Sequence, residues 1–469
     1  MPDLDFRDKA VTVVGLGIEG EDMARFLARR GAYVTVSDRK PREKLSARIE
    51  ALADLPIRFS LGRNESGEIA TADAVFLSQG VPSDLPGVEE ARLRGAPIWS
   101  MLSLFMEFCA GPIVGITGSS GKTTTTALLA EMMRAESLPH FVGGNIGIGL
   151  LENLEQIRPY TWVVLEVSHT QLQHLRQPPH VAAVLNITPN HLDQFSWEEY
   201  RGLKANILSR QARSDYAVLN RDDPETLALA KKAPGAIRFF SLSPGKPQDE
   251  GAFLEGGYAV WRHNGSEERL FSQSNIRLRG RHNLANALAA AALARVCGVS
   301  PPAIEEAVSS FLGVPHRLQY VATASGVDYY NDSIATTPER TLAAIRSFPQ
   351  PLVLLLGGRD KHPPLEELAR AANEHCRAVI TFGESGPLLS SAIAAQAARS
   401  PSAAKASLVS ASDLDEAVAA ARKQSKRGNV VLLSPACTSF DAYDNFEQRG
   451  RHFQELVMAF AREAELSLP

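Results

Sequence analysis

One short stretch of the sequence could hold a chain of phosphates. Thr117-Gly-Ser-Ser-Gly-Lys-Thr123 follows the apolar run Ile113–Ile116 and precedes a helical pattern that begins at Lys122. Glycines let backbone N–H groups turn toward phosphate oxygens, and a helix N-terminus adds partial positive charge. Lys122 could reach the β- and γ-phosphates, and the Thr123 hydroxyl could bind Mg²⁺. The spacing departs from GxxxxGK[ST], because Ile116 occupies the first glycine position, and a glycine turn without a ligand is the alternative.

A second glycine-rich turn follows the first apolar run of the chain. Gly15-Leu-Gly-Ile-Glu-Gly20 comes directly after Ala10–Val14, and Asp38 closes the next apolar run, Tyr33–Ser37. This is the pattern of a dinucleotide-binding turn, with an acid about twenty residues on. By itself the pattern is weak evidence. It predicts a diphosphate or nucleotide at the edge of a parallel sheet, and a tight turn without a ligand is the alternative.

A carboxylate, an imidazole and an ammonium group form a third candidate set. Glu166 ends an apolar run, and His191 follows the run Ala182–Leu185. The carboxylate of Glu166 and the hydroxyl of Thr123 suit a hard cation such as Mg²⁺. A lone histidine is more often a packed or capping residue than a ligand. Lys204, on a predicted helix, would normally be a solvated charge, so sequence spacing alone does not select it.

A fourth cluster lies near the C-terminus. Ser434-Pro-Ala-Cys-Thr-Ser-Phe-Asp-Ala-Tyr-Asp-Asn-Phe-Glu-Gln-Arg-Gly450 follows the buried run Val430–Leu433. Small and hydroxyl residues just beyond a strand are typical of a binding loop, although a helix cap would explain a single Ser or Asp. Cys437 could be a nucleophile, but no base can be named for it. We therefore interpret Cys437 as a small packed residue.

Strands and helices must alternate to position these residues. Apolar runs alternate with helical patterns such as Glu21–Arg30 and Leu284–Val296, which predicts an α/β fold with parallel sheets. Short antiparallel strands are expected around Tyr258–Arg262. The length of 469 residues favours about three domains. We place their boundaries in Cys109–Pro112 and Gly313–Pro315. The predicted domains are a Rossmann-like domain (1–110), a P-loop ATPase-type central domain (111–313) and a second Rossmann-like domain (314–469).

The composition excludes several classes of protein. The chain carries 49 basic and 53 acidic side chains, so its net charge of −4 does not favour general binding to nucleic acid or to membrane surfaces. No apolar run is long enough to span a membrane, and the N-terminus does not have the pattern of a signal peptide. The four cysteines are far apart and form no CxxC pair. This favours a cytoplasmic protein without a disulfide scaffold or structural zinc.

Taken together, the motifs resemble those of the Mur ligases, and within that family those of its glutamate-adding branch. The resemblance covers nearly the whole chain. The segments that carry it are Gly118–Thr123, Gly143–Gly147, Glu166–Ser168, Asn186–Asp193, Gly280–Ala287, Pro315–Arg317, Asn331–Ser333, Leu356–Lys361 and Ser434–Gly450.

The resemblance implies an acid–amino-acid ligase that forms ADP and phosphate. The substrates would be UDP-N-acetylmuramoyl-L-alanine, glutamate and ATP, and the product a cytoplasmic precursor of peptidoglycan. The first domain would bind the UDP-sugar, the second ATP and Mg²⁺, and the third would close over ATP and bring glutamate. The alanine carboxylate would be activated as an acyl phosphate. The enzyme is expected to be a monomer, with neither nucleic acid nor membrane insertion involved.

The resemblance also implies roles for residues at matching positions. Those for the UDP-sugar are Gly15, Gly17, Gly20, Asp38, Arg39 and Gly80. Asn145 and Ser168 would line the channel for the muramoyl-alanine part. Those for ATP are Gly118, Ser119, Ser120, Gly121, Lys122, Thr123, Thr124, Asn283, Asn286, Arg317 and Asp332. Those for the metal are Thr123, Glu166, His191 and Lys204, the last as a carbamate. Those for glutamate are Thr336, Lys361, Ser439 and Phe446, and the catalytic set is Lys122, His191, Lys204 and Arg317.

Two positions depart from the family pattern. Ile334 follows Asn331-Asp-Ser333 where the common form has lysine, and His169 stands where the common form has a second serine. Both lie near substrate in the family, so they bear on which enantiomer of glutamate is the acceptor. The resemblance favours D-glutamate, and a branch that adds L-glutamate is the alternative. A folylpolyglutamate-type ligase, an NAD-dependent oxidoreductase that uses Gly15–Gly20, and a nucleotide-binding regulatory protein are further alternatives.

Overall fold

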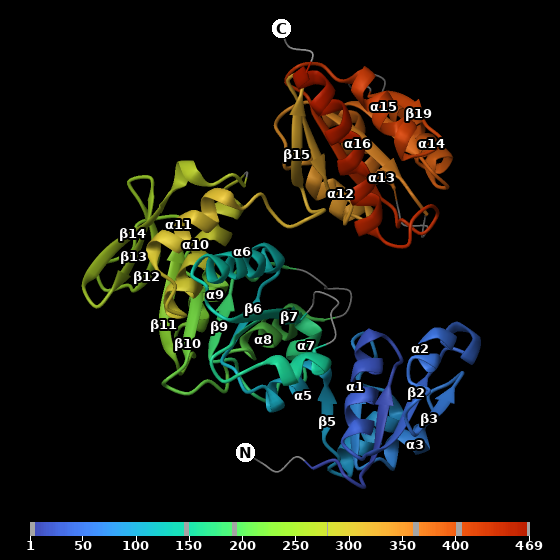
Figure 1. Ribbon diagram of the computed structural model, residues 1–469, viewed down its shortest axis with the longest axis vertical. Coiled ribbons are helices and arrows are strands. Elements are labelled where there is room, and N and C mark those ends of the chain that lie inside the picture. The colour runs from blue at the N-terminus through green and yellow to red at the C-terminus, as the bar shows by residue number, and fades with distance from the viewer. Residues whose placement is uncertain are drawn as a thin grey trace. The chain divides into compact units, whose positions relative to one another are not determined.

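The computed structural model describes residues 5–144, 150–189, 195–278, 280–359, 365–399 and 406–466. The chain forms two compact units, Met1–Phe311 and Leu312–Pro469 (Figure 1). The first unit contains two sheets and the second unit contains one. No helix in these ranges is long and apolar enough to cross a membrane.

The first sheet is fully parallel, with strand order β3-β2-β1-β4-β5. Strand β1 lies between β2 and β4, so the strand order reverses direction at β1: β2 and β3 lie on one side of it, and β4 and β5 on the other. In such sheets ligands bind at the carboxyl end of the strands where the order reverses. Its strands are β1 (Ala10–Val14), β2 (Tyr33–Asp38), β3 (Ile57–Leu61), β4 (Ala74–Leu77) and β5 (Ile98–Ser100). Its helices are α1 (Ile18–Arg29), α2 (Ser46–Glu50), α3 (Ser66–Ala70), α4 (Pro86–Leu93) and α5 (Met101–Phe108).

The second sheet has the order β14-β13-β12-β11-β10-β9-β6-β8-β7. It is parallel from β7 to β12 and ends in the antiparallel ladder β12-β13-β14. Its strands are β6 (Ile113–Thr117), β7 (His140–Gly144), β8 (Trp162–Glu166), β9 (Val181–Val184), β10 (Tyr216–Asn220), β11 (Ala236–Ser241), β12 (Gly251–Glu255), β13 (Tyr258–His263) and β14 (Ser266–Ser272). Its helices are α6 (Lys122–Ala135), α7 (His169–Leu172), α8 (Trp197–Ala205), α9 (Pro224–Leu229), α10 (Arg281–Val296) and α11 (Pro301–Ser310).

The sheet of the second unit has the order β15-β16-β20-β17-β18-β19. Strand β15 is antiparallel to β16, and the other pairs are parallel. Its strands are β15 (Gln319–Ala324), β16 (Val327–Asn331), β17 (Leu352–Gly357), β18 (Cys376–Phe382), β19 (Ser407–Ser410) and β20 (Val430–Ala436). Its helices are α12 (Pro338–Ile345), α13 (Glu366–His375), α14 (Gly386–Arg399), α15 (Leu414–Gln424) and α16 (Phe446–Leu466).

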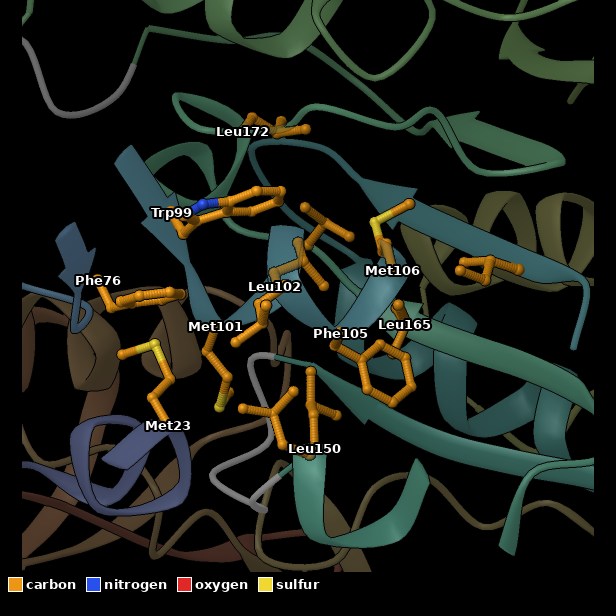
Figure 2. Packing of buried hydrophobic residues seen from close by; sticks show 14 of the residues in the cluster. Met23, Phe76, Trp99, Met101, Leu102, Phe105, Met106, Leu150, Leu165 and Leu172 are labelled. Atoms are coloured by element: carbon orange, nitrogen blue, oxygen red, sulfur yellow. The ribbon is translucent and has the colours of Figure 1, made fainter. Parts of the chain in front are cut away.

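One continuous core joins the two sheets of the first unit. Figure 2 shows Met23 of α1 and Phe76 of β4 in the same cluster as Leu165 of β8 and Leu172 of α7. Helix α5 supplies Met101, Leu102, Phe105 and Met106, and all four are buried. A polar contact accompanies this packing, because the carboxylate of Asp22 in α1 accepts hydrogen bonds from the backbone N–H groups of Leu151 (2.9 Å) and Glu152 (3.1 Å). The two sheets are therefore fixed to each other by both apolar and polar contacts.

The predicted α/β class is confirmed, including the antiparallel strands around Tyr258. Two predicted helix starts are wrong, since α1 begins at Ile18 and α10 at Arg281. Each helix begins directly after a glycine of its motif, Gly17 or Gly280, and an apolar pattern misses such a first turn because it is polar or exposed. The sheets fall within 10–100, 113–272 and 319–436, but contacts group the first two in one unit. The boundary near residue 110 stays a prediction.

Candidate active site

The glycine turn after β6 is held in shape by Asn186. The N–H of Ser119 donates to the Asn186 carbonyl oxygen (3.0 Å), and the N–H of Ser120 donates to Asn186 Oδ1 (2.9 Å). The side-chain amide of Asn186 donates back to the Ser120 carbonyl oxygen (3.1 Å). Because Asn186 comes just after β9, the neighbour of β6, the sheet itself places this clamp. The predicted phosphate loop, residues 118–121, thus has a defined geometry at the N-terminus of α6.

Gly121 caps α6 in the left-handed conformation, with a φ of +85°. A Cβ at this position would also overlap the side-chain oxygen of Asn286 in α10. Asn286 is buried and its amide donates to Asn283 Oδ1 (3.2 Å). The structure therefore brings Asn283 and Asn286 beside the phosphate loop, with Thr123 and Thr124 in the first turn of α6.

Lys204 is a buried cation beside the phosphate loop. Its side chain is only 1% exposed, and Nζ donates to Thr117 Oγ1 (3.1 Å) and to the Gly118 carbonyl oxygen (3.2 Å). Lys122 Nζ donates to the same carbonyl oxygen (3.0 Å). Burial, and then the charge of Lys122, lower the pKa of Lys204 to about 7, although Glu166 opposes the shift. Lys204 is therefore partly neutral at pH 7, unlike a solvated lysine.

The carboxylate of Glu166 completes this group. Glu166 is the last residue of β8, is 4% exposed, and lies level with Ile116 of β6 in the ladder. A buried carboxylate, a hydroxyl from Thr123 and a modified Lys204 would form an oxygen-donor set of the kind that Mg²⁺ prefers. His191 lies outside the described residues. Within those residues no three His, Cys, Asp or Glu side chains gather as a metal site would require.

Sequence reasoning missed Tyr200, which connects Lys204 to the phosphate loop. The Tyr200 hydroxyl is 3.1 Å from Ser119 Oγ, and its buried ring lies 5.4 Å from Lys204 Nζ. The ring of His169 packs against Tyr200 (5.9 Å) and Phe195 (5.6 Å). Tyr200 and Lys204 are four residues apart on α8, so helical spacing could have linked them. His169, one of the two departures from the family pattern, therefore sits in an aromatic group beside Ser168.

The first glycine turn is organised by Asp38. The carboxylate of Asp38 accepts from the N–H of Leu16 (2.7 Å) and the N–H of Lys40 (2.8 Å), and it is 7% exposed. Gly15 has a φ of +90°, and a Cβ at Gly20 would overlap the Gly15 carbonyl oxygen. The acid of the motif thus stabilises the turn at the end of β1. Arg39 next to it is exposed, as is Gly80, which has a φ of +85°.

A polar chain joins this turn to Ser168. Glu19, in the first turn of α1 after Gly17, accepts from the N–H of Gln79 (2.7 Å) and contacts the side chain of Gln171. Burial raises the pKa of Glu19. The side-chain oxygen of Gln171 accepts from the N–H of Ser168 (3.0 Å), and Ser168 Oγ lies 2.9 Å from Thr170 Oγ1. Polar contacts through Glu19 and Gln171 therefore connect the predicted UDP-binding turn to Ser168, which is predicted to bind the muramoyl-alanine part.

In the second unit, Asp332 lies at the carboxyl end of β16. Asp332 Oδ2 accepts from Ser434 Oγ (2.8 Å), and Oδ1 accepts from the N–H of Leu318 (3.1 Å). Burial raises the pKa of Asp332 to about 7, although these hydrogen bonds and the nearby cations Arg317 and Arg340 oppose the shift. Arg317 is exposed beside it.

Arg449 is a second residue that sequence reasoning missed. Its side chain is fully buried and donates to Ser333 Oγ (3.0 Å) and to the carbonyl oxygens of Ser333 (3.0 Å), Cys437 (3.1 Å), Gly357 (3.3 Å) and Thr438 (3.3 Å). One guanidinium from α16 thereby joins the last residue of β17 to the segments that follow β16 and β20. Its place in the Ser434–Gly450 block was a signal, but the sequence does not say which loops it joins.

The residues predicted to bind the glutamate substrate lie on these same loops. Thr336 follows β16, Ser439 is 2% exposed after β20, and Phe446 begins α16. The Phe446 carbonyl oxygen accepts from Ser333 Oγ (2.8 Å). Cys437 is buried and accepts a hydrogen bond from Ser385 Oγ (3.3 Å), which agrees with a packed residue. Lys361 and Asn145 lie outside the described residues.

Three family models match successive parts of the chain. They are the Mur ligase MurD-like N-terminal domain at residues 9–100, the Mur ligase middle domain at 116–294 and the Mur ligase glutamate ligase domain at 316–437. Among curated relatives, the UDP-N-acetylmuramoylalanine–D-glutamate ligase of Symbiobacterium thermophilum is 41% identical, covering 96% of this chain and 98% of its own. The enzyme of the same name from Koribacter versatilis is 38% identical, covering 98% and 99%.

Solved structures with the same fold are more distant in sequence. The UDP-N-acetylmuramate–alanine ligase MurC of Thermotoga maritima has a TM-score of 0.54 at 20% identity, covering 96% of this chain and 100% of its own. MurF of Acinetobacter baumannii has a TM-score of 0.55 at 18% identity, covering 90% and 91%. At this identity the likeness concerns the fold alone.

Proposed function

The chain belongs to the Mur ligase family, and from this premise we propose that it joins D-glutamate to UDP-N-acetylmuramoyl-L-alanine. ATP is consumed and ADP and phosphate are released, in the synthesis of a peptidoglycan precursor in the cytoplasm. The observation that carries the proposal is the phosphate loop of residues 118–121 with the buried Lys204 and Glu166 beside it. Relatives named for this reaction, similar over almost their whole length, support it.

The first chemical step brings two anions together. The alanine carboxylate attacks the γ-phosphorus of ATP, which forms an acyl phosphate and releases ADP. Cations must screen this approach, and we assign that task to Lys122 and Arg317. Lys122 supports this role because its ammonium lies at the turn into which phosphates would fit. The amine of glutamate then attacks the activated carbonyl carbon, and phosphate leaves.

The residues around Lys122 fit Mg²⁺ bound with ATP. Thr123, Glu166 and Lys204, together with His191, would hold the ion or its water ligands. When bound, Mg²⁺ neutralises charge on the phosphate oxygens. Asn283 and Asn286 beside the loop, and Asp332 and Arg317 in the second unit, would bind the rest of ATP.

Lys204 suits a carbamate for two physical reasons. A neutral amine is the form that adds CO₂, with release of one proton, and burial lowers the pKa of Lys204 to about 7. The product is an anion, so the two adjacent ammonium groups would become an ion pair. That change would also supply an oxygen donor next to Glu166.

The two ends of the nucleotide-sugar substrate would meet different parts of the first unit. The turn of Gly15, Gly17 and Gly20, with Asp38, Arg39 and Gly80, would bind the UDP part. Asn145 and Ser168 would bind the muramoyl-alanine part. In the second unit, Thr336, Lys361, Ser439 and Phe446 would bind glutamate. We expect the enzyme to act as a monomer.

One assay tests this proposal. Purified protein is incubated with UDP-N-acetylmuramoyl-L-alanine, ATP and either D- or L-glutamate, and ADP and the ligated product are both measured. We expect product with D-glutamate and almost none with the Lys122→Ala variant. Faster turnover with L-glutamate would place the chain in the L-glutamate branch, which the replacement of lysine by Ile334 keeps as the alternative. Reduction of a nicotinamide cofactor without ATP consumption would refute the ligase function.

A further inference from the structure

The second unit contains a small cavity beside Asp332, and one of the charged residues that line it, Arg340, has no proposed role. Its volume is about 160 Å³, and it lies between the segment after β16 and helix α12. Arg317, Asp332, Ile334 and Arg340 line it, together with alanines of α12. Arg317 and Asp332 are proposed ATP-binding residues, but Arg340 has no such assignment.

The backbone holds Arg340 at this cavity. Arg340 lies in the first turn of α12, and Nη1 donates to the carbonyl oxygen of Ile334 (3.1 Å). The side chain of Ile334 brings no charge to the cavity wall, so its contribution is this carbonyl oxygen. The alanines of α12 are small and leave room above the helix. The guanidinium is thus directed to the cavity while most of its donors stay available for a ligand.

The charges around the cavity favour an anion. Two guanidinium groups line it, whereas its one carboxyl group, Asp332, already accepts hydrogen bonds from Ser434 and Leu318. Burial also favours the protonated form of Asp332, which weakens the negative charge on the cavity wall. Two arginines on one small cavity are suited to the oxygens of a phosphoryl group, which a guanidinium binds through two parallel hydrogen bonds.

We propose that Arg340 is a further ATP-binding residue, and that with Arg317 it binds the phosphate oxygens of ATP at this cavity. This inference rests on the proposed function, because Arg317 and Asp332 are placed at ATP there. It also explains how this chain can do without a charged side chain at position 334. The positive charge would come from Arg340, in the first turn of α12.

The test compares three variants of the full-length enzyme. Arg340→Ala should raise the KM for ATP about tenfold, the order expected for losing a charge-assisted hydrogen bond, with kcat changed less than about threefold. Arg340→Lys should lie between wild type and Arg340→Ala, because it keeps the charge and loses the two-pronged geometry. Arg346→Ala is the matched control, since Arg346 is the exposed C-cap of the same helix and does not line the cavity.

Each outcome decides between the proposals. If Arg340→Ala has the same KM for ATP as Arg346→Ala in an enzyme with normal wild-type activity, this inference fails and the ligase function stands. A rise in the KM for glutamate alone would also overturn the assignment to ATP. If the wild-type chain makes no ligated product, the proposed function itself fails. Thermal unfolding of each variant, with an unchanged Tm expected, separates a binding defect from misfolding.

Discussion

Lys204 is buried and lies close to the ammonium group of Lys122, unlike an ordinary solvated lysine. We predict that Lys204→Ala lowers ligase activity at least about 100-fold, the range seen when one preorganised charge is removed from an active site. Acetate or formate should restore part of this activity, because a small carboxylate can occupy the place of the carbamate. The measurement is turnover with and without the added salt, with equal ionic strength of chloride as control. Full activity of the variant, or equal rescue by chloride, would contradict the role.

The raised pKa of Asp332 should make the stability of the folded protein depend on pH. Its folded-state pKa of about 7 lies above its ordinary value of 3.8, so between these values the folded protein keeps a proton that the unfolded chain has released. The stability contributed by Asp332 is therefore full below about pH 4 and is lost as the pH rises through 7. We predict that Asp332→Asn reduces the fall in Tm between pH 5 and pH 8, by roughly 2–4 °C for each kcal/mol recovered.

The asparagine variant is a close mimic of the protonated acid. Its oxygen can still accept from the N–H of Leu318, and its amide can donate to Ser434 Oγ, which in turn donates to Thr341 Oγ1 (3.1 Å). The measurement is thermal unfolding of wild type and variant at both pH values. An identical fall in Tm for the two proteins would show that Asp332 titrates normally in the fold.

Sequence patterns found some of these residues and not others, for physical reasons. The turn at residues 118–121 between β6 and α6 could be predicted, because its glycine pattern is local in the sequence. Lys204 could be named only through family resemblance, because burial of a lysine is a property of tertiary packing. The contacts of Tyr200 with Ser119 and of Arg449 with Ser333 could not be assigned from the sequence, since these partners lie far away along the chain.

At the scale of elements, the entry into α6 depends on one glycine. We predict that Gly121→Ala destabilises the protein by about 1–3 kcal/mol and abolishes ATP binding. The residue has a φ of +85°, and its Cβ would overlap the side chain of Asn286. Gly202 in helix α8 is the matched control, because it is exposed and a Cβ there meets nothing within 4 Å.

The two glycine variants should differ in direction. Gly202→Ala should leave ATP binding intact and raise the free energy of unfolding by about 0.5–1 kcal/mol, since alanine favours a helix interior. Chemical denaturation and calorimetric titration with ATP measure both quantities. If Gly121→Ala binds ATP as wild type does, the residue is not needed for the shape of the loop, and the phosphate-loop assignment loses its main structural support.

The order of elements was easier to predict than their ends. Strand β1 has the predicted bounds, Ala10–Val14, because a continuous apolar run marks a buried parallel strand. The starts of α1 and α10 were predicted three residues too late. Their first turns belong to glycine motifs, and Ile18, Arg281 and His282 there are exposed. Periodicity reports burial, so it is least informative where the first turn of a helix is exposed.

At the scale of the whole molecule, the net charge of −4 conceals how cations are distributed. Lys122 and Lys204 lie together at the end of β6, and Arg317 and Arg340 lie together at the cavity beside β16. Each group sits at the carboxyl ends of parallel strands. A chain that binds anionic substrates needs cations only there, and acidic side chains elsewhere balance them. The low net charge is therefore compatible with strong local binding of phosphates.

Each unit contains complete hydrophobic clusters of its own, which predicts that the first unit folds alone. The described clusters containing Val13 and Val75 lie within the first unit, and those containing Leu354 and Val431 lie within the second. A fragment of residues 1–311 should therefore unfold cooperatively, with a sharp transition in circular dichroism. It should make no ligated product, because Arg317, Asp332 and the residues proposed to bind glutamate belong to the second unit. A fragment without a cooperative transition would contradict the structural independence of the unit, and ligase activity in the fragment would contradict the roles assigned to the second unit.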